Sequence, residues 1–255
     1  MLLAVDAGNT HTVLGLFEED RLRADWRIGT RKEMTADELG ALLRSLFAGE
    51  GLDPGQVDGV IVSSVVPDWN TVLATTAEKT FRRRALFVEP GIKTGLPILV
   101  DNPHEVGADR IVNAVAAVHR FGAPLIVLDF GTATTFDVVG PKGEYLGGAI
   151  APGLGISAEA LFQRAARLTR VDIQRPARLI GRNTQESVQA GLFHGYVALV
   201  EGLVRRLRAE LGVEAPVVAT GGLASIFRDE LVFVRSIEPD LTLLGLRLIW
   251  EKNTR

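Results

Sequence analysis

The sequence contains no cysteine, which excludes disulfides, zinc–thiolate sites, iron–sulfur clusters and thiol nucleophiles. Its histidines number four, and none is spaced as a metal-ligand pair, which argues against a transition-metal site. Long apolar runs are also missing, because stretches such as residues 124–128 fall far short of the roughly 20 residues that a membrane span needs. An excess of one charge is missing too: Lys and Arg number 28 against 31 Asp and Glu, a net charge of −3. The charge therefore favours neither nucleic acid nor an anionic membrane as a partner.

The chain begins MLLAVDAGNT, which has no basic segment and reaches Asp6 at once. This start is not typical of a signal peptide, so we expect a cytoplasmic protein without membrane contact. The length of 255 residues allows one large domain or two smaller ones. Hydrophobic residues make up 47% of the chain and charged residues 23%, which indicates a folded globular protein.

A strand-and-turn pattern occurs twice in the sequence. Residues 3–6 read LAVD and precede AGNTHTVLGL, and residues 126–129 read IVLD and precede FGTATTFDVV. In register, Asp6 corresponds to Asp129 and Gly8 to Gly131. Each copy has an apolar strand, an Asp-x-Gly turn with Thr beside it, and a second strand, which predicts two β-hairpins.

Further elements follow the same order in both halves. A helix (36–48, then 184–211) precedes a buried strand (57–66, then 217–222), and the first of these strands ends in small polar residues. The pattern predicts two α/β domains with mixed sheets, although a chance likeness of two segments is the alternative. The breaker cluster FGAP at residues 121–124 sets the expected domains at 1–121 and 122–255. Two such domains facing each other would leave a ligand-binding cleft between them.

Both predicted hairpins carry groups suited to phosphate and metal. A turn rich in Gly, Asn and Thr offers N–H and hydroxyl groups to phosphate oxygens, and Asp6 could hold Mg²⁺ directly or through water. An ordinary Asx-stabilised turn is the alternative for this first copy. In the second copy Thr132 is placed to donate to a phosphate. Asp129 ends an apolar strand with no Lys or Arg between residues 120 and 142, which favours a metal or phosphate role over packing.

The segment NPHEVGADR at residues 102–110 predicts the start of a helix, with Asn102 as N-cap and Pro103 in the first turn. The helix continues IVNAVAAVHRFG, which is apolar enough to be largely buried. Asp109 and Arg110 interrupt that apolar pattern, and Gly107 lowers helix propensity beside them. We interpret Asp109 as a general base and Arg110 as an anion-binding group. A structural salt bridge is the alternative, although adjacent helical residues point about 100° apart.

Two glycine patterns carry weaker signals. Residues 153–158 match the dinucleotide pattern G-x-G-x-x-A, but this pattern is weak alone, and we interpret it as a turn followed by a helix start. Residues 221–222 are glycines at the end of a strand, before an expected helix over LASIFRDEL. They fit either a nucleotide lying against the backbone or a plain strand-to-helix turn.

Several motifs in order resemble type III pantothenate kinase, within the superfamily of acetate and sugar kinases, Hsc70 and actin. The resemblance extends from Asp6 to about Gly222, and NPHEVGADR is its most specific part. The matching motifs are DAGNTHTVLGLF (6–17), NPHEVGADRIVNAVAA (102–117), DFGTATTFD (129–137), GGAIAPG (147–153) and RNTQESVQAGLFHG (182–195). The resemblance implies duplicated actin-like, ribonuclease H-like domains.

The resemblance also implies roles for individual residues. Asp109 would be the proton acceptor, Asp129 would bind a monovalent cation, K⁺ or NH₄⁺, and Thr132 would contact ATP. The pantothenate contacts would be Gly107, Ala108, Asp109, Arg110 and Thr184. The contacts to the ATP phosphates would be Asp6, Ala7, Gly8, Asn9, Thr10, His11, Thr12 and Val13. The chain departs from the family at Val100, where an aromatic residue is frequent, so we assign Val100 no substrate contact.

The expected function is transfer of the γ-phosphoryl group of ATP, with Mg²⁺, to pantothenate, the first step of coenzyme A synthesis. The resemblance further implies a homodimer. Phosphoryl transfer needs positioning, charge neutralisation and a base for the attacking hydroxyl, and the residues above can supply these. The alternatives are another small-molecule kinase of the superfamily, or a non-catalytic nucleotide-binding regulator. Asp109 argues against the regulator, because a binding module needs no base.

Overall fold

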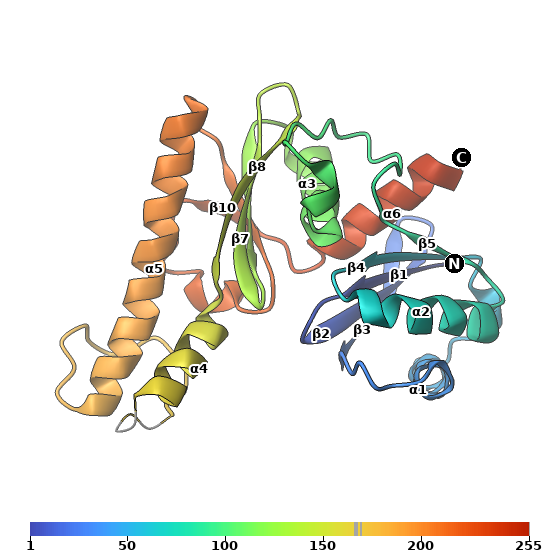
Figure 1. Cartoon of the computed structure of the whole chain (residues 1–255), viewed down its shortest axis with the longest axis horizontal. Helices are drawn as coiled ribbons and strands as arrows, with labels where there is room; N and C mark the ends of the chain where they lie inside the picture. Colours follow the sequence, from blue (N-terminus) through green and yellow to red (C-terminus); the bar gives the residue numbers. More distant parts are fainter. Residues whose placement is uncertain (166–167, 169, 255) are drawn as a thin grey trace. The chain divides into compact units, whose positions relative to one another are not determined.

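The computed structural model describes residues 1–165, 168 and 170–254, and their contacts divide the chain into two compact units. Unit 1 comprises Met1–Pro97, Asp101–Ala116 and the C-terminal segment from Asp240. Unit 2 comprises Ile98–Val100 and Ala117–Pro239. Each unit contains one sheet of five strands with helices packed on it (Figure 1), which confirms the predicted duplicated α/β plan.

The sheet of unit 1 is mixed, as predicted. Its first three strands form an antiparallel meander, and the last two run parallel to the first. The predicted first hairpin is therefore confirmed, and its turn lies between Ala7 and His11. The strands are β1 (Leu2–Ala7), β2 (His11–Glu18), β3 (Arg21–Gly29), β4 (Gly59–Ser64) and β5 (Ala85–Phe87), in the order β3-β2-β1-β4-β5.

Helices pack on this sheet. The helices α1 (Ala36–Gly49) and α2 (Pro67–Thr76) form a core with alternate residues of β1, β2 and β4, while α6 (Leu241–Thr254) contacts the same three strands (Figure 1). Gly15 and Gly59 make room for α6. A Cβ at Gly15 would lie 2.7 Å from Leu243 Cδ1, and one at Gly59 would lie 2.2 Å from Trp250 Cζ2. The strands thus lack side chains at the two points where α6 presses against them.

The C-terminal segment packs on the first unit rather than on the second. The sequence grouped it with residues 122–255, and that division remains a prediction. Contacts of α6 with β1 join the two ends of the chain, a long-range pairing that no local pattern indicates.

The sheet of unit 2 repeats the plan of the first. The strands β6 and β7 form the predicted second hairpin, β8 extends it antiparallel, and β9 and β10 run parallel to β6. These strands are β6 (Leu125–Phe130), β7 (Ala133–Val139), β8 (Tyr145–Pro152), β9 (Val217–Thr220) and β10 (Val234–Ile237), in the order β10-β9-β6-β7-β8.

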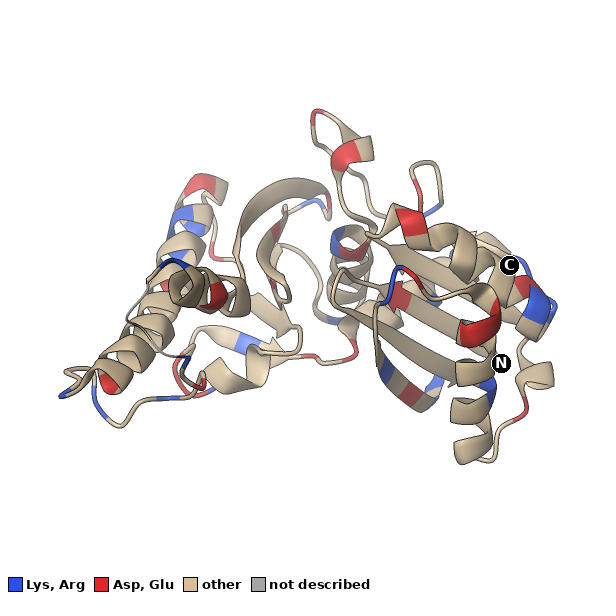
Figure 2. Cartoon of the chain, turned by 60° about the horizontal axis from the view of Figure 1, so that its bottom comes forward, with Lys and Arg blue, Asp and Glu red and all other residues tan. Residues whose placement is uncertain are grey.

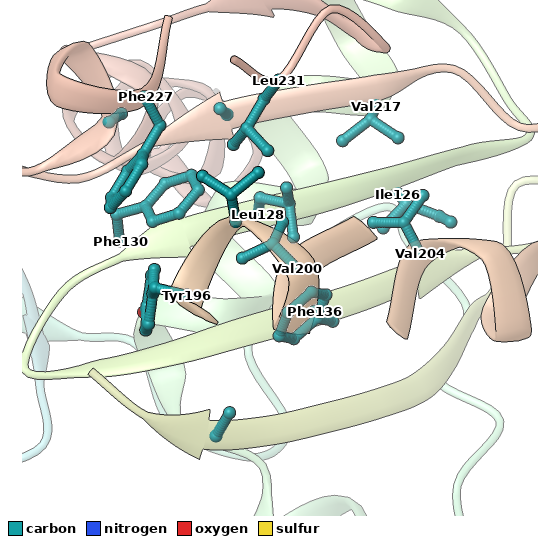
Figure 3. Packing of buried hydrophobic residues seen from close by; sticks show 14 of the residues in the cluster. Ile126, Leu128, Phe130, Phe136, Tyr196, Val200, Val204, Val217, Phe227 and Leu231 are labelled. Carbon is teal, nitrogen blue, oxygen red and sulfur yellow. The ribbon is translucent and has the colours of Figure 1, made fainter. Parts of the chain in front are cut away.

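One face of this second sheet packs on α5 (Thr184–Leu211), with α4 (Leu154–Arg164) beside that helix (Figure 1). Figure 3 shows the core, in which Phe130, Tyr196 and Phe227 lie together. The bounds of α5 agree with the sequence because both ends have local signals. The Asn183 side chain accepts from Glu186 N–H at the start, and Gly212 adopts φ 73° at the end.

Two helix predictions were wrong in extent. Residues Pro103–Glu105 form only a 3₁₀ turn capped by Asn102, and the helix α3 begins later and spans Ala108–Phe121. The extended backbone of Val106 separates the two pieces. The helix expected over residues 223–231 is a single 3₁₀ turn, Ala224–Phe227.

Two global features complete the description. Figure 2 shows Lys and Arg interspersed with Asp and Glu along each unit, as the small net charge suggests. Within the part of the chain that the structure describes, no helix has both the length and the apolar character for crossing a membrane.

Candidate active site

The turn of the first hairpin is braced from the neighbouring strand end. Gly8 N–H donates to His11 O at 3.0 Å and closes the turn. The Thr30 hydroxyl donates to Gly8 O at 2.7 Å, and Thr30 N–H donates to Thr10 O at 3.0 Å. Thr12 and Thr30 also share a hydroxyl–hydroxyl bond of 2.9 Å. The turn therefore has a fixed shape in which a phosphate could meet preset N–H groups.

The residues of this turn differ in exposure. Asn9, Thr10 and His11 are exposed, whereas the side chain of Thr12 is buried and its hydroxyl points to Thr30. The side chain of Thr12 thus maintains the turn. The tip itself, residues 9–11, is exposed to solvent.

Asp6 lies at the carboxyl end of β1, in parallel register with Ser63 at the end of β4. The Ser63 hydroxyl is buried and has no hydrogen-bond partner among the described residues. A carboxylate and a hydroxyl at adjacent strand ends supply oxygen atoms. Such oxygens can coordinate Mg²⁺ or form hydrogen bonds with its bound waters. In the described part of the chain no three His, Cys, Asp or Glu side chains gather as a ready-made metal site.

Asp109 lies in the first turn of α3, next to Arg110. Its Oδ1 accepts the Arg110 backbone N–H at 2.8 Å. Burial raises the pKa of Asp109, and this N–H and the Arg110 charge oppose the rise only in part. Gly107 allows this placement, because a Cβ there would lie 2.6 Å from Asp109 Oδ1. A carboxylate with a raised pKa beside a guanidinium suits proton abstraction next to an anionic substrate.

The raised pKa predicts a pH-dependent effect of Asp109 on stability. A carboxyl whose folded-state pKa is raised stabilises the native chain while protonated, and this stability is lost as pH rises through the folded pKa. We expect Asp109→Asn to raise Tm near neutral pH, with the difference from wild type shrinking as pH falls toward the ordinary value of 3.8. Scanning calorimetry over a pH series measures this. A Tm difference that stays constant across the series would contradict it.

Asp129 and its surroundings form the corresponding place in unit 2. Asp129 lies half-buried next to the last residue of β6, and Gly221, which directly follows β9, lies against it with φ +93°. A Cβ at Gly221 would lie 2.5 Å from Asp129 Oδ1. Glycine is therefore required at residue 221 both for its backbone conformation and for the space that the carboxylate occupies.

Residues at the start of α4 and on α5 contact the hairpin whose turn follows Asp129. A Cβ at Gly153 would lie 2.2 Å from Thr132 O, so the start of α4 abuts the turn directly. Beneath it, the Tyr196 hydroxyl shares a short hydrogen bond with the buried Thr134 hydroxyl. Burial raises the pKa of Tyr196, so this phenol stays neutral. Thr132 itself is exposed at the tip.

The predicted site residues thus fall into two groups. Asp109 and Arg110, which are adjacent in the sequence, lie at the start of α3 in unit 1, which also contains the first hairpin. Unit 2 contains Asp129 and Thr132 on one hairpin, whereas Thr184 is exposed at the start of α5. Val100 lies in unit 2 beside Gly147, where a Cβ would be 3.5 Å from Val100 Cγ1.

Several supporting residues were not predicted. Thr30 stabilises the first turn by donating a hydrogen bond to Gly8 O. Tyr196 stabilises the second hairpin through its hydrogen bond with Thr134. Neither residue stands out in the sequence: Thr30 follows the end of β3, and Tyr196 is one of many apolar or aromatic residues on α5. The sequence does carry a signal for Ser63, which lies beside Asp6. It belongs to the strand end VSS at residues 62–64, where polar residues interrupt an apolar strand.

The sequence comparisons with known proteins all match one family. The sequence pattern of type III pantothenate kinase matches residues 2–206 of the chain. The type III pantothenate kinase of Myxococcus xanthus is 56% identical over 253 residues, covering 99% of both chains. That of Brevibacillus brevis is 55% identical with the same coverage, and that of Moorella thermoacetica is 52% identical over the full length of both.

Solved structures agree on the fold. A protein of Campylobacter jejuni described as a Baf family transcriptional activator matches with a TM-score of 0.62 at 16% identity, covering 98% of both chains. The inorganic polyphosphate/ATP-glucomannokinase of Arthrobacter matches with a TM-score of 0.52 at 15% identity, also covering 98% of both. These similarities place the chain in the actin-like fold of sugar kinases, as predicted.

Proposed function

The chain belongs to the type III pantothenate kinase family and phosphorylates pantothenate with ATP, the first step of coenzyme A biosynthesis, and we propose that Asp109 is its catalytic base. The observation that carries this proposal is the placement of Asp109 in the first turn of α3, where its Oδ1 accepts the Arg110 N–H and lies against Gly107, and burial there raises its pKa. In the proposed reaction Asp109 accepts the proton of the primary hydroxyl of pantothenate as that oxygen attacks the γ-phosphorus. The bond from the γ-phosphorus to the bridging oxygen of ATP breaks, and ADP leaves with the electron pair. Arg110 faces the carboxylate of the substrate, a geometry that suits a guanidinium. Gly107 and Ala108 complete the substrate contacts.

The first hairpin is the proposed place for the ATP phosphates. Its exposed tip offers N–H and hydroxyl groups, and Thr30 keeps that tip in shape. Asp6 would hold Mg²⁺, which neutralises phosphate charge when bound. The other residues proposed to line this phosphate site are Ala7, Gly8, Asn9, Thr10, His11, Thr12 and Val13.

The second hairpin is the proposed place for a monovalent cation and a further ATP contact. Asp129 is one half-buried carboxylate closely approached by a glycine, and a single negative charge matches a singly charged ion. Thr132, exposed at the tip, would donate its hydroxyl to ATP. The close contact of Gly153 with the Thr132 carbonyl and the hydrogen bond of Tyr196 with Thr134 support this role, because they fix the position of the turn that carries Thr132.

A substrate panel tests the proposed acceptor. The purified chain is incubated with Mg·ATP and, in separate reactions, pantothenate, glucose, N-acetylmannosamine or acetate, and the products are identified by mass spectrometry. We expect a phosphorylated product with pantothenate alone, formed at its primary hydroxyl. Phosphorylation of a sugar or acetate at a comparable rate would instead indicate another kinase of the same fold.

We also propose that the enzyme is a homodimer through the exposed face of α5. Gly191, Gly195 and Ala198 recur on this face at helical spacing and are exposed, while the opposite face packs on the sheet. Open space surrounds Gly191 and Gly195. A stripe without side chains lets a second helix approach closely, and a symmetric dimer would use the same stripe on both copies.

Ala198→Arg should convert the dimer to monomer, because two long cations would meet across the symmetry axis. Sedimentation velocity of wild type and Ala198→Arg measures this directly. Ala41→Arg, at an exposed alanine of α1, is the matched control and should leave the dimer intact. If Thr184 completes the partner's substrate pocket, the monomer should also lose activity. A wild-type chain that sediments as an active monomer would contradict the proposal.

A further inference from the structure

Ser63 and Asp6 are neighbours at the functional end of the first sheet. The strands β1 and β4 are parallel, and their register pairs Asp6 with Ser63. Val60 and Val62 point into the core formed with α1 and α2, as do Val5 and Ala7. Because side chains alternate along a strand, Ser63 and Asp6 both point to the opposite face of the sheet.

The Ser63 hydroxyl differs from that of the next residue. The Ser63 side chain has 0% exposure, and its Oγ has no hydrogen-bond partner among the described residues. The Ser64 hydroxyl, by contrast, accepts Val66 N–H at 3.1 Å and donates to Val66 O at 3.4 Å. A buried hydroxyl without a partner destabilises a protein, so each case in a native fold requires an explanation.

We propose that Ser63 is a positioning residue of the ATP site that acts through Asp6. When Mg·ATP binds, the Ser63 hydroxyl donates to one carboxylate oxygen of Asp6 and holds the other toward the metal and its waters. Neighbouring strands lie about 4.8 Å apart, and rotation about χ1 lets a serine hydroxyl reach a side chain on the adjacent strand. The inference rests on the proposed role of Asp6 in binding Mg·ATP.

The position of Ser63 favours this role over that of a small core residue. Valine or alanine would fill a buried strand position without an unsatisfied polar group, as Val62 and Val60 do one and three residues earlier on β4. The hydroxyl occurs where β4 reaches the level of Asp6, at the end of the sheet that carries the phosphate turn. A group that is unsatisfied without ligand and satisfied with it contributes its hydrogen bond only to the bound state.

The test compares ligand-free stability with nucleotide affinity in Ser63→Ala and Ser64→Ala. Melting of the ligand-free protein gives Tm, and titration calorimetry with the magnesium complex of a non-hydrolysable ATP analogue gives Kd. Ser63→Ala should keep or raise Tm yet bind about tenfold more weakly, since a hydrogen bond to a charged group is lost. Ser64→Ala should lower Tm and leave Kd unchanged. Wild-type affinity in Ser63→Ala would overturn the inference, as would equal loss of affinity in both variants.

A double-mutant cycle with Asp6→Asn separates this inference from the function on which it rests. If Ser63 acts through Asp6, adding Ser63→Ala to Asp6→Asn should weaken binding no further. If Asp6→Asn binds weakly and Ser63→Ala binds as wild type, only the inference about Ser63 fails. If Asp6→Asn itself binds as wild type, the proposed role of Asp6 fails, and the role of Ser63 fails with it. Additive losses in the double variant would also overturn the inference.

Discussion

Asp109→Asn should bind Mg·ATP and pantothenate but turn over about 10²–10⁴-fold more slowly, the usual contribution of a general base. The substitution keeps the size of the side chain, and its amide oxygen can still accept the Arg110 backbone N–H that Asp109 Oδ1 accepts at 2.8 Å. What it removes is an oxygen able to take the hydroxyl proton of the substrate. Steady-state kinetics should therefore show a large fall in kcat with KM values close to those of wild type.

The matched control for this variant is Asp20→Asn. Asp20 is exposed in the turn between β2 and β3, at the opposite end of β2 from the phosphate turn. It should keep wild-type kinetics. Binding of both substrates to Asp109→Asn, measured by calorimetry, separates lost chemistry from lost binding. Wild-type kcat in Asp109→Asn would remove this residue from the mechanism.

Activity should depend on K⁺ or NH₄⁺, with Asp129 as the reason. A singly charged ion coordinated by this half-buried carboxylate would steady the turn that carries Thr132. Losing a charge-assisted contact of about 1.5–3 kcal/mol corresponds to roughly 10- to 100-fold in rate. Assays with Mg·ATP in Tris buffer, with K⁺ or Na⁺ added at equal ionic strength, should therefore differ by at least about tenfold.

Asp129→Asn gives the control for the cation effect. In this variant the rate should be low and nearly equal in the two salts, because the charged ligand is gone. If backbone N–H groups alone satisfied Asp129, the wild-type enzyme would run equally fast in K⁺ and Na⁺. That result would reject the cation role.

Features with local causes could be predicted from the sequence. Both hairpins were visible because an apolar strand, an Asp-x-Gly turn and a second strand are contiguous. The helix α5 agrees with the predicted range 184–211, and the structure shows local signals at both ends, Asn183 as the cap at the start and Gly212 after the last residue. The start of α3 was missed because Asn102 and Pro103 are typical of an α-helix start, yet here they begin only a 3₁₀ turn.

Features that depend on distant contacts could not be predicted. Nothing near α6 indicates that Leu243 and Trp250 fill the places left by Gly15 and Gly59. In the candidate site, acidic residues such as Asp109 were recognisable because they interrupt apolar surroundings. The groups that support them were not, since the unsatisfied hydroxyl of Ser63 becomes apparent only when β4 is placed beside β1.

The pH dependence of kcat/KM for pantothenate is the most direct test of Asp109 as the base. The base must be ionised, so the rate should rise with pH through an ionisation lying above the usual aspartate range, where burial places the pKa of Asp109. The residual activity of Asp109→Asn should lack this step. If the same step persists in Asp109→Asn, another group is the base and the account of this site is wrong.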